Sequence, residues 1–192
     1  MSEFDLILAS RSPRRQELLR QIGVRFCVHS ADIEEVHQSH ETPRDYVLRL
    51  AQSKAQKVAD SYPGLPVLGA DTIGICDGKI LEKPLNQQHC REMLQLMSNT
   101  CHQVLSAVAV VHGDKILTAV SCTDVTFREL STEEIDRYWH TGEPLDKSGS
   151  YAIQGLGAVF VQSIAGSYSN VVGLPIEALV PLLNEFEIPV WR

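Results

Sequence analysis

The segment that most constrains the fold is a strand, loop and helix near the start of the chain. Residues 6–8, Leu-Ile-Leu, form an apolar run that is typical of a strand buried on both faces of a sheet. Pro13 fits the first position of a helix that we expect to reach about Gln21, with Ser12 as its N-cap and Gly23 beyond its end. This order of strand, loop and helix is ordinary in itself.

The loop of this segment carries an unusual charge. Arg11, Arg14 and Arg15 surround the predicted start of the helix, where the partial positive charge of the helix favours acids instead. Backbone N–H groups and guanidinium groups together can bind a polyanion such as a phosphate chain. The alternative is a solvated basic patch. We favour the anion site because ligands of α/β proteins bind at the carboxyl ends of strands.

The composition limits the kind of partner. The chain has 192 residues and a formal net charge of -7, which argues against binding to a nucleic-acid backbone. We therefore expect residues 1–192 to form a single domain whose arginine cluster serves a small anion. Five scattered cysteines without a C-x-x-C pair favour reduced thiols in a cytoplasmic protein. The sequence shows neither a signal peptide nor an apolar run of membrane-spanning length.

The rest of the chain alternates between strand and helix patterns. Strands are expected at residues 24–28, 66–76, 79–81, 103–111, 116–127 and 158–164. Helices are expected at residues 43–61 and 87–98, after the capping box at Ser131, and after Pro175. Residues 166–170 read as a polar loop. Pro181 is expected to kink or restart the last helix.

Two acidic positions are candidates for chemistry. Asp71 interrupts the apolar run of residues 66–76, where a carboxylate is costly to bury unless it is paired, hydrogen-bonded or bound to metal. We predict a catalytic or metal-binding role, the alternative being an Asp bonded to nearby backbone. Glu35 follows a strand together with Asp32 and Glu34, and such a loop can hold a hard metal ion, although loop acids are usually only solvated.

Basic and polar positions follow in three further segments. Lys54 falls on the apolar stripe of the helix at residues 43–61, so it either snorkels to solvent or reaches into an anion cleft. Lys83, at the end of the predicted hairpin, is a second candidate for phosphate contact. Residues 143–157 are rich in turn formers and polar groups, among them Lys147 and Gln154, and are expected to contact substrate.

Five motifs, spread over nearly the whole chain, together resemble the Maf family of nucleotide pyrophosphatases. They lie at residues 9–15 (ASRSPRR), 69–72 (GADT), 82–84 (EKP), 143–149 (EPLDKSG) and 173–175 (GLP). Residues 146–155 and 166–175 are similar to the subgroup that hydrolyses dTTP and UTP. The sister subgroup acting on 7-methyl-GTP typically has cysteine where Lys147 stands.

The resemblance implies a fold, a cofactor and an assembly. The implied fold is α/β, with a central twisted mixed sheet flanked by helices and two lobes with a cleft between them, as in ITPase-like proteins. The implied cofactor is a divalent metal cation, Mg²⁺ or Mn²⁺. A cytoplasmic homodimer that binds small-molecule nucleoside triphosphates, and neither nucleic acid nor membrane, is expected.

The resemblance also assigns roles to residues. Asp71 matches the proposed proton acceptor. The other matched positions are the selectivity residues Arg14, Thr72 and Gln154 and the cleft residues Glu35, Lys54 and Lys83. Beyond these matches, Ser10, Arg15 and Lys147 are expected to contact the substrate. Glu35 and Asp71 are the expected metal ligands.

These observations predict hydrolysis of dTTP and UTP, with modified pyrimidine nucleotides as further candidates, to the monophosphate and pyrophosphate. Water would attack the α-phosphorus with help from a metal ion. Asp71 would act either directly as the base or through the metal, and both alternatives remain open. A P-loop NTPase and a serine hydrolase are disfavoured because the chain lacks both G-x-x-x-x-G-K-[ST] and G-x-S-x-G. A non-catalytic nucleotide-binding module that regulates division or growth is the remaining alternative.

Overall fold

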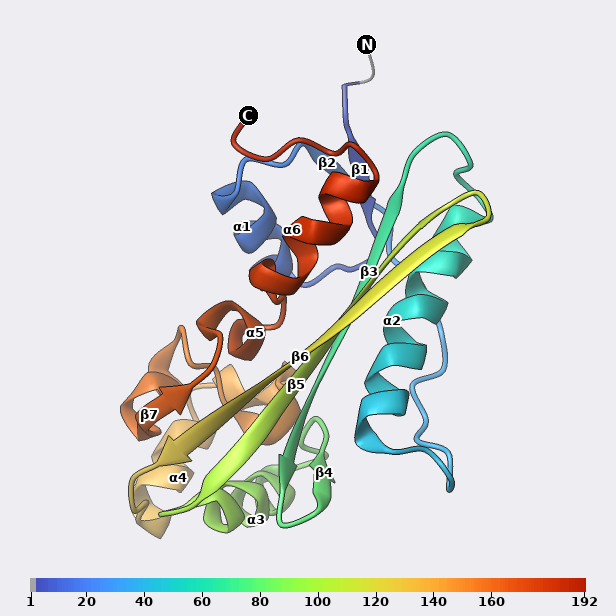
Figure 1. Ribbon diagram of the computed structural model, residues 1–192. Helices are drawn as coiled ribbons and strands as arrows, with labels where there is room; N and C mark the ends of the chain where they lie inside the picture. The colour runs from blue at the N-terminus through green and yellow to red at the C-terminus, as the bar shows by residue number, and fades with distance from the viewer. Residues whose placement is uncertain (1–2) are drawn as a thin grey trace. The chain divides into compact units, whose positions relative to one another are not determined.

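The computed structural model describes residues 3–192, which form a seven-stranded sheet flanked by helices (Figure 1). The strands are β1 (Leu6–Leu8), β2 (Phe26–Val28), β3 (Val67–Cys76), β4 (Lys79–Leu81), β5 (Cys101–His112), β6 (Lys115–Phe127) and β7 (Val161–Ala165). Their order is β2-β1-β3-β5-β6-β7, with β4 paired to β3. β1 is parallel to β2 and β3, whereas the β3–β4 and β6–β7 pairs are antiparallel. The expected mixed sheet is therefore confirmed.

The predicted helices are present in order, and α5 is an additional helix. The α-helices are α1 (Pro13–Gln21), α2 (Pro43–Ala59), α3 (Gln87–Met97), α4 (Thr132–Trp139), α5 (Tyr168–Val172) and α6 (Ile176–Glu185). Three short 3₁₀ helices are η1 (Glu143–Asp146), η2 (Ser148–Ser150) and η3 (Leu156–Phe160). No helix within residues 3–192 is long and apolar enough to cross a membrane.

The chain divides into two compact units, as the expectation of two lobes requires. Unit 1 comprises Met1–Asp71, Ser106–Ser121 and Gly173–Arg192. Unit 2 comprises Thr72–Leu105 and Cys122–Val172. Strands β3, β5 and β6 each contribute residues to both units. The cleft that we expected between the lobes stays a prediction.

Unit 1 is built on the buried strand β1. All three of its residues are at most 2% exposed, which agrees with the apolar run in the sequence. Within unit 1, α1 and α6 lie on one side of the strands and α2 lies on the other side (Figure 1). α2 approaches β3 closely at Gly69, where an added Cβ would lie 2.1 Å from the carbonyl oxygen of Ala51. Glycine at this position is therefore what allows the helix to pack on the strand.

Unit 2 is held by the α3 stripe and an aromatic cluster. Cys90, Leu94 and Met97 of α3 are fully buried, as their helical spacing predicts. The Phe127 ring contacts Tyr151 and Phe160 with centroids 4.8 and 5.9 Å apart. These aromatic contacts join β6 to the segment that follows η2.

Three helices begin with a side-chain N-cap. Thr42 and Asn86 accept hydrogen bonds from the backbone N–H groups of the third residue on, and Ser131 forms the complete capping box with Glu134. The expectation for Ser12 is wrong in one respect. It occupies the N-cap position of α1, but its side chain makes no capping bond. Its backbone N–H instead donates to Ser10 Oγ at 3.2 Å.

Three expectations for the strands and loops are corrected. β2 begins at Phe26 rather than at residue 24. Residues 158–160 belong to η3, so β7 starts only at Val161. Residues 168–170, expected in a polar loop, lie in α5, where Ser167 Oγ accepts the N–H of Asn170 at 3.2 Å and so caps the helix.

Of the two outcomes expected at Pro181, a restart of the last helix is wrong, and a kink stays a prediction. α6 runs through Pro181 from Ile176 to Glu185. Proline removes one backbone bond there, but Leu179 and Leu183 on either side are fully buried. Tertiary packing thus maintains the helix despite the missing bond.

Candidate functional site

The centre of the candidate site in unit 1 is a lysine that bridges two carboxylates. Lys54 Nζ lies 2.6 Å from Asp71 Oδ1 and 2.6 Å from Glu35 Oε1. The side chains of Lys54 and Asp71 are 10% and 9% exposed, whereas Glu35 is 39% exposed. Lys54 therefore does not snorkel to solvent, and Asp71 is ion-paired rather than bonded only to nearby backbone. The pairing explains why β3 tolerates a carboxylate within an apolar strand.

Burial and pairing act in opposite directions on Asp71. Burial raises the pKa of Asp71 above its usual value, while the positive charges of Lys54 and Arg15 oppose that rise. The charge of Glu35 raises the pKa further. A carboxylate whose pKa lies above the usual range is better suited to accept a proton near neutral pH than an exposed aspartate is.

Arg15 belongs to the same electrostatic group. Its Nε donates to the carbonyl oxygen of Gly173 at 2.9 Å, and its Nη1 donates to Ser10 Oγ at 3.2 Å. Burial lowers the pKa of the Arg15 guanidinium, the charge of Asp71 raises it, and the charge of Arg14 lowers it. Arg15 of the predicted anion loop thus shares the electrostatic environment of Asp71, and Arg14 acts on Arg15 in turn.

The sheet register explains how the arginine loop comes to Asp71. Leu8 pairs with Leu68 in the parallel β1–β3 ladder, and the N–H of Ala9 donates to the carbonyl oxygen of Leu68 at 2.8 Å. The chain that leaves β1 therefore starts beside the stretch of β3 that leads to Asp71. This is the carboxyl-end arrangement that the sequence predicts for a ligand site.

The predicted acidic loop contributes one residue only. Glu35 contacts Lys54, whereas Asp32 and Glu34 are exposed. Residues 3–192 contain no group of three or more His, Cys, Asp or Glu side chains placed to hold a metal ion. The carboxylates of Asp71 and Glu35, which both contact Lys54, are nevertheless a suitable donor set for Mg²⁺. This ion is often held by one or two carboxylates together with substrate phosphates.

The remaining predicted residues lie in unit 2. The Ser148 hydroxyl donates to the carbonyl oxygen of Thr72 at 3.1 Å. The N–H of Gly149 donates to the carbonyl oxygen of Glu82 at 3.2 Å. These bonds join the segment after Lys147 to Thr72 and to the residue before Lys83. Lys147 itself is ion-paired with Asp146. Lys83 and Gln154 have exposed side chains.

The sequence interpretation missed the role of Glu143 and Tyr138. Glu143 belongs to the segment at residues 143–157 that is expected to contact substrate, and Tyr138 lies in the helix expected after Ser131. The structure joins them, because the Tyr138 hydroxyl donates to Glu143 Oε1 at 2.6 Å. A buried tyrosine hydroxyl normally needs such a partner, and this need was the available signal.

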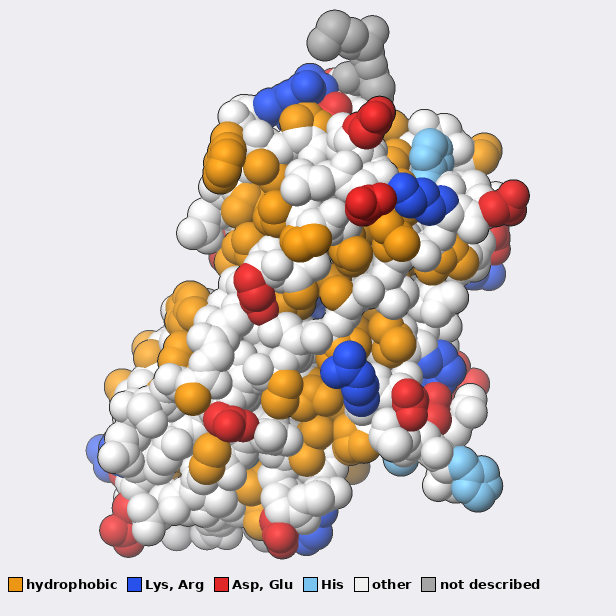
Figure 2. All heavy atoms as spheres, in the orientation of Figure 1, with side chains coloured by type: hydrophobic (Ala, Val, Ile, Leu, Met, Phe, Trp, Pro, Cys, Tyr) orange, Lys and Arg blue, Asp and Glu red, His pale blue; other side chains and the backbone are white. Residues whose placement is uncertain are grey.

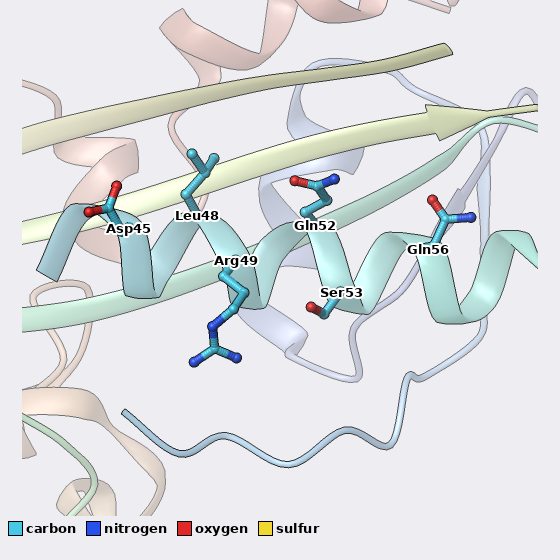
Figure 3. Close-up of a pocket in the computed structure, with 6 residues that line it drawn as sticks. All are labelled: Asp45, Leu48, Arg49, Gln52, Ser53 and Gln56. Carbon is cyan, nitrogen blue, oxygen red and sulfur yellow. The ribbon is translucent and has the colours of Figure 1, made fainter. Parts of the chain in front are cut away.

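A pocket on α2 is separate from these residues. It is lined by Asp45, Leu48, Arg49, Gln52, Ser53 and Gln56 (Figure 3). These residues occupy the helix face opposite the buried stripe that carries Lys54. On the face shown in Figure 2, acidic and basic side chains of the described residues are interspersed with one another.

Comparison with known proteins places this geometry in a family. The family model described as Maf-like protein matches residues 5–186. The chain belongs to the Maf family. A dTTP/UTP pyrophosphatase from Saccharophagus degradans is 52% identical over 192 residues, covering 98% of this chain and 91% of that protein. A dTTP/UTP pyrophosphatase from Aliivibrio fischeri is 49% identical over 191 residues, covering 96% of this chain and 99% of that protein.

The Maf chain is also similar in fold to a solved structure of low sequence identity. The structure of the Ham1 protein from Staphylococcus aureus aligns with a TM-score of 0.53 and 12% identity, over 95% of this chain and 97% of that one. The similarity concerns the fold alone. It agrees with the ITPase-like architecture that the sequence motifs imply.

Proposed function

We propose that this Maf protein hydrolyses dTTP and UTP to the nucleoside monophosphate and pyrophosphate. The observation that carries the proposal is about 50% identity over nearly the whole chain to proteins named dTTP/UTP pyrophosphatase. The buried Asp71–Lys54–Glu35 cluster supports it, because a perturbed carboxylate beside cations is typical of a site for phosphate chemistry. Modified pyrimidine nucleotides are further candidate substrates.

In this proposal Asp71 accepts a proton from the attacking water. The water oxygen forms a bond to the α-phosphorus, the bond from that phosphorus to the bridging oxygen breaks, and pyrophosphate leaves. Lys54 holds the Asp71 carboxylate in place through their 2.6 Å contact. Arg14, Arg15 and Lys83 offset the negative charge of the triphosphate and of the leaving pyrophosphate.

A divalent cation fits beside Asp71 and Glu35, which would hold it together with phosphate oxygens. Bound there, Mg²⁺ or Mn²⁺ supplies charge neutralisation for the phosphates. Ser10 accepts a bond from Arg15 and so orients the guanidinium toward the same group of charges. Lys147 is a further cation for the substrate.

Thr72 and Gln154 read the pyrimidine base in this proposal, together with Arg14. An exposed glutamine amide presents both a donor and an acceptor, which suits the edge of uracil or thymine. We also propose that the chain acts as a single domain over residues 1–192, since three strands run through both units. A cytoplasmic homodimer is part of the proposal. The five free cysteines of the described chain agree with the cytoplasmic location, because thiols stay reduced there.

The test is pyrophosphate release from a panel of nucleoside triphosphates with Mg²⁺ or Mn²⁺. We expect dTTP and UTP to be cleaved, and Asp71→Asn to lower kcat by about 10²- to 10⁴-fold, the usual contribution of a general base. Asp77→Asn, in the exposed β3–β4 turn, is the matched control and should keep full activity. Binding of triphosphates without any release, under either metal, would instead identify a non-catalytic regulatory module.

A further inference from the structure

The inference concerns the segment of unit 2 that carries Gln154. Gln154 is exposed, yet the residues on both sides of it are held in place. Ala152, before it, is 3% exposed, and Gly157, after it, is buried. A side chain that reads a base must be presented in one orientation, so the groups that hold this turn bear on what it can recognise.

The segment after Gln154 is bound by Glu143. The backbone N–H of Leu156 donates to Glu143 Oε2 at 2.8 Å, and that of Gly157 donates to Glu143 Oε1 at 2.9 Å. These are N–H groups at the start of η3, which a carboxylate stabilises well. Burial alone would raise the pKa of Glu143, but the hydrogen bonds from Tyr138 and from these N–H groups outweigh burial and lower it.

The segment before Gln154 is bound by Tyr138. The backbone N–H of Ala152 donates to the Tyr138 hydroxyl oxygen at 3.3 Å, while that hydroxyl donates its own proton to Glu143 at 2.6 Å. Burial, followed by the bond to Glu143, raises the pKa of Tyr138, so the phenol stays protonated and keeps this donor. One tyrosine and one glutamate therefore hold both arms of the turn.

The glycines of the turn allow this close contact. A Cβ on Gly155 would lie 2.2 Å from Glu143 Oε2, and a Cβ on Gly157 would lie 2.7 Å from the Tyr138 hydroxyl oxygen. Only backbone without side chains fits against the pair at these two points. The two glycines after Gln154 therefore allow close packing against Tyr138 and Glu143, rather than the approach of a nucleotide phosphate.

α4 anchors the pair. Tyr138 packs edge-on against Phe160 with ring centroids 4.8 Å apart. Asp136, on the same helix, accepts bonds from Arg91 Nη2 at 2.6 and 2.7 Å and so ties α4 to α3. Tyr138 is therefore set on a helix that is tied to its neighbour, and Glu143 follows shortly after that helix in η1.

We propose that Tyr138 and Glu143 are positioning residues that fix the Gln154 turn and thereby set the preference for the nucleotide base. The inference rests on the proposed function, since it concerns which triphosphate is preferred. Neither residue has to touch the substrate. Both oxygens of the Glu143 carboxylate already accept hydrogen bonds from the protein.

The experiment measures kcat and KM for dTTP, UTP, CTP and ATP in wild type, Tyr138→Phe, Glu143→Gln and Gln154→Ala. We expect Gln154→Ala to reduce the preference for UTP over CTP by about tenfold, the usual effect of one lost hydrogen bond to a ligand. Tyr138→Phe and Glu143→Gln should reduce the same preference by about three- to tenfold, mainly through KM. Tyr138→Phe removes a single hydroxyl and carries the test if Glu143→Gln does not fold.

A double-mutant cycle separates positioning from general stability. In the Gln154→Ala background, Tyr138→Phe should cause no further loss of base preference, because both changes act through one side chain. Glu133→Gln, at an exposed position of the same helix as Tyr138, is the matched control. It should leave the base preference unchanged.

Two results would overturn the inference in distinguishable ways. If wild type prefers dTTP and UTP while Tyr138→Phe and Glu143→Gln lower kcat/KM equally for all four nucleotides, the pair has only a structural role and the proposed function stands. If wild type releases no pyrophosphate from dTTP or UTP with either metal, the proposed function fails and the inference fails with it.

Discussion

At the scale of single residues, the protein depends on charges that are buried and shared. Lys54 is in contact with Asp71 and Glu35 at once, so its removal would leave Asp71 within the strand without its nearest cation. Buried pairs add little net stability, but breaking one by deleting a partner is costly. The ion pair is thus better understood as a means to keep a functional carboxylate inside the fold than as a source of stability.

Lys54→Met should lower the free energy of unfolding by about 3 kcal/mol, because it leaves an uncompensated buried carboxylate. Urea denaturation gives the value. Lys57→Met, on the exposed face of the same helix, is the control and should change stability by less than about 0.5 kcal/mol. The double variant Lys54→Met/Asp71→Asn should recover part of the loss. If Lys54→Met and Lys57→Met were equally stable, the buried ion pair between Lys54 and Asp71 would be contradicted.

His102 leads to a prediction about pH. It is 2% exposed, its Nε2 lies 2.9 Å from the Tyr151 hydroxyl, and burial lowers its pKa to about 4. The unfolded chain, with an ordinary histidine pKa of about 6.5, therefore binds more protons than the folded chain between these two values. Stability should fall as the pH drops through this window, by up to about 3 kcal/mol, and no further below pH 4 on this account.

The measurement is the free energy of unfolding at several pH values between 4.5 and 6.5, in wild type and in His102→Gln. The difference between the two profiles isolates His102, since all other groups are common to both. We expect a flatter profile for His102→Gln, whereas His112→Gln, at an exposed position, should follow wild type. Parallel profiles for wild type and His102→Gln would rule out a neutral buried histidine.

At the scale of elements, the close approach of α2 to β3 fixes where Lys54 and Asp71 can meet. The approach depends on Gly69, since a Cβ there would meet the backbone of Ala51 at 2.1 Å and of Ala55 at 2.7 Å. Backbone atoms cannot move aside as a flexible side chain can. The GADT motif thus combines a packing residue with the proposed proton acceptor two positions on.

Gly69→Ala should lower the free energy of unfolding by about 3 kcal/mol or more, the upper range for overpacking. Gly64→Ala is the matched control, because an added Cβ there meets nothing within 4 Å. Thermal or urea unfolding of both variants provides the comparison. A Gly69→Ala protein as stable as the Gly64→Ala protein would show that α2 does not pack so closely on β3.

Elements with local signals were predictable from the sequence. The caps at Thr42, Asn86 and Ser131 act within three residues of themselves, and the stripe of α3 repeats within one helix. The start of β7 was not predictable, because η3 depends on bonds between residue 143 and residues 156 and 157. The helix at residues 168–172 was missed although its cap, Ser167, is local.

At the scale of the whole molecule, the family and the candidate residues were predictable from sequence motifs, but the pairing of those residues was not. Asp71 and Lys54 each stood out alone, one as a carboxylate in an apolar strand and the other as a lysine on an apolar stripe. Their contact joins residues 17 positions apart in two different elements, and no local pattern encodes it. The role of Glu143 was missed for the same reason, since the backbone N–H groups that it accepts lie 13 and 14 positions later in the chain.

The discontinuity of unit 1 has a consequence for how the protein is made. Arg15 bonds to the carbonyl oxygen of Gly173, a residue 158 positions later in the chain. On the ribosome, α1 and the arginine loop must therefore wait for nearly the whole polypeptide before their final contacts exist. During synthesis, apolar surface of unit 1 therefore stays accessible to chaperones until its last segment has been made.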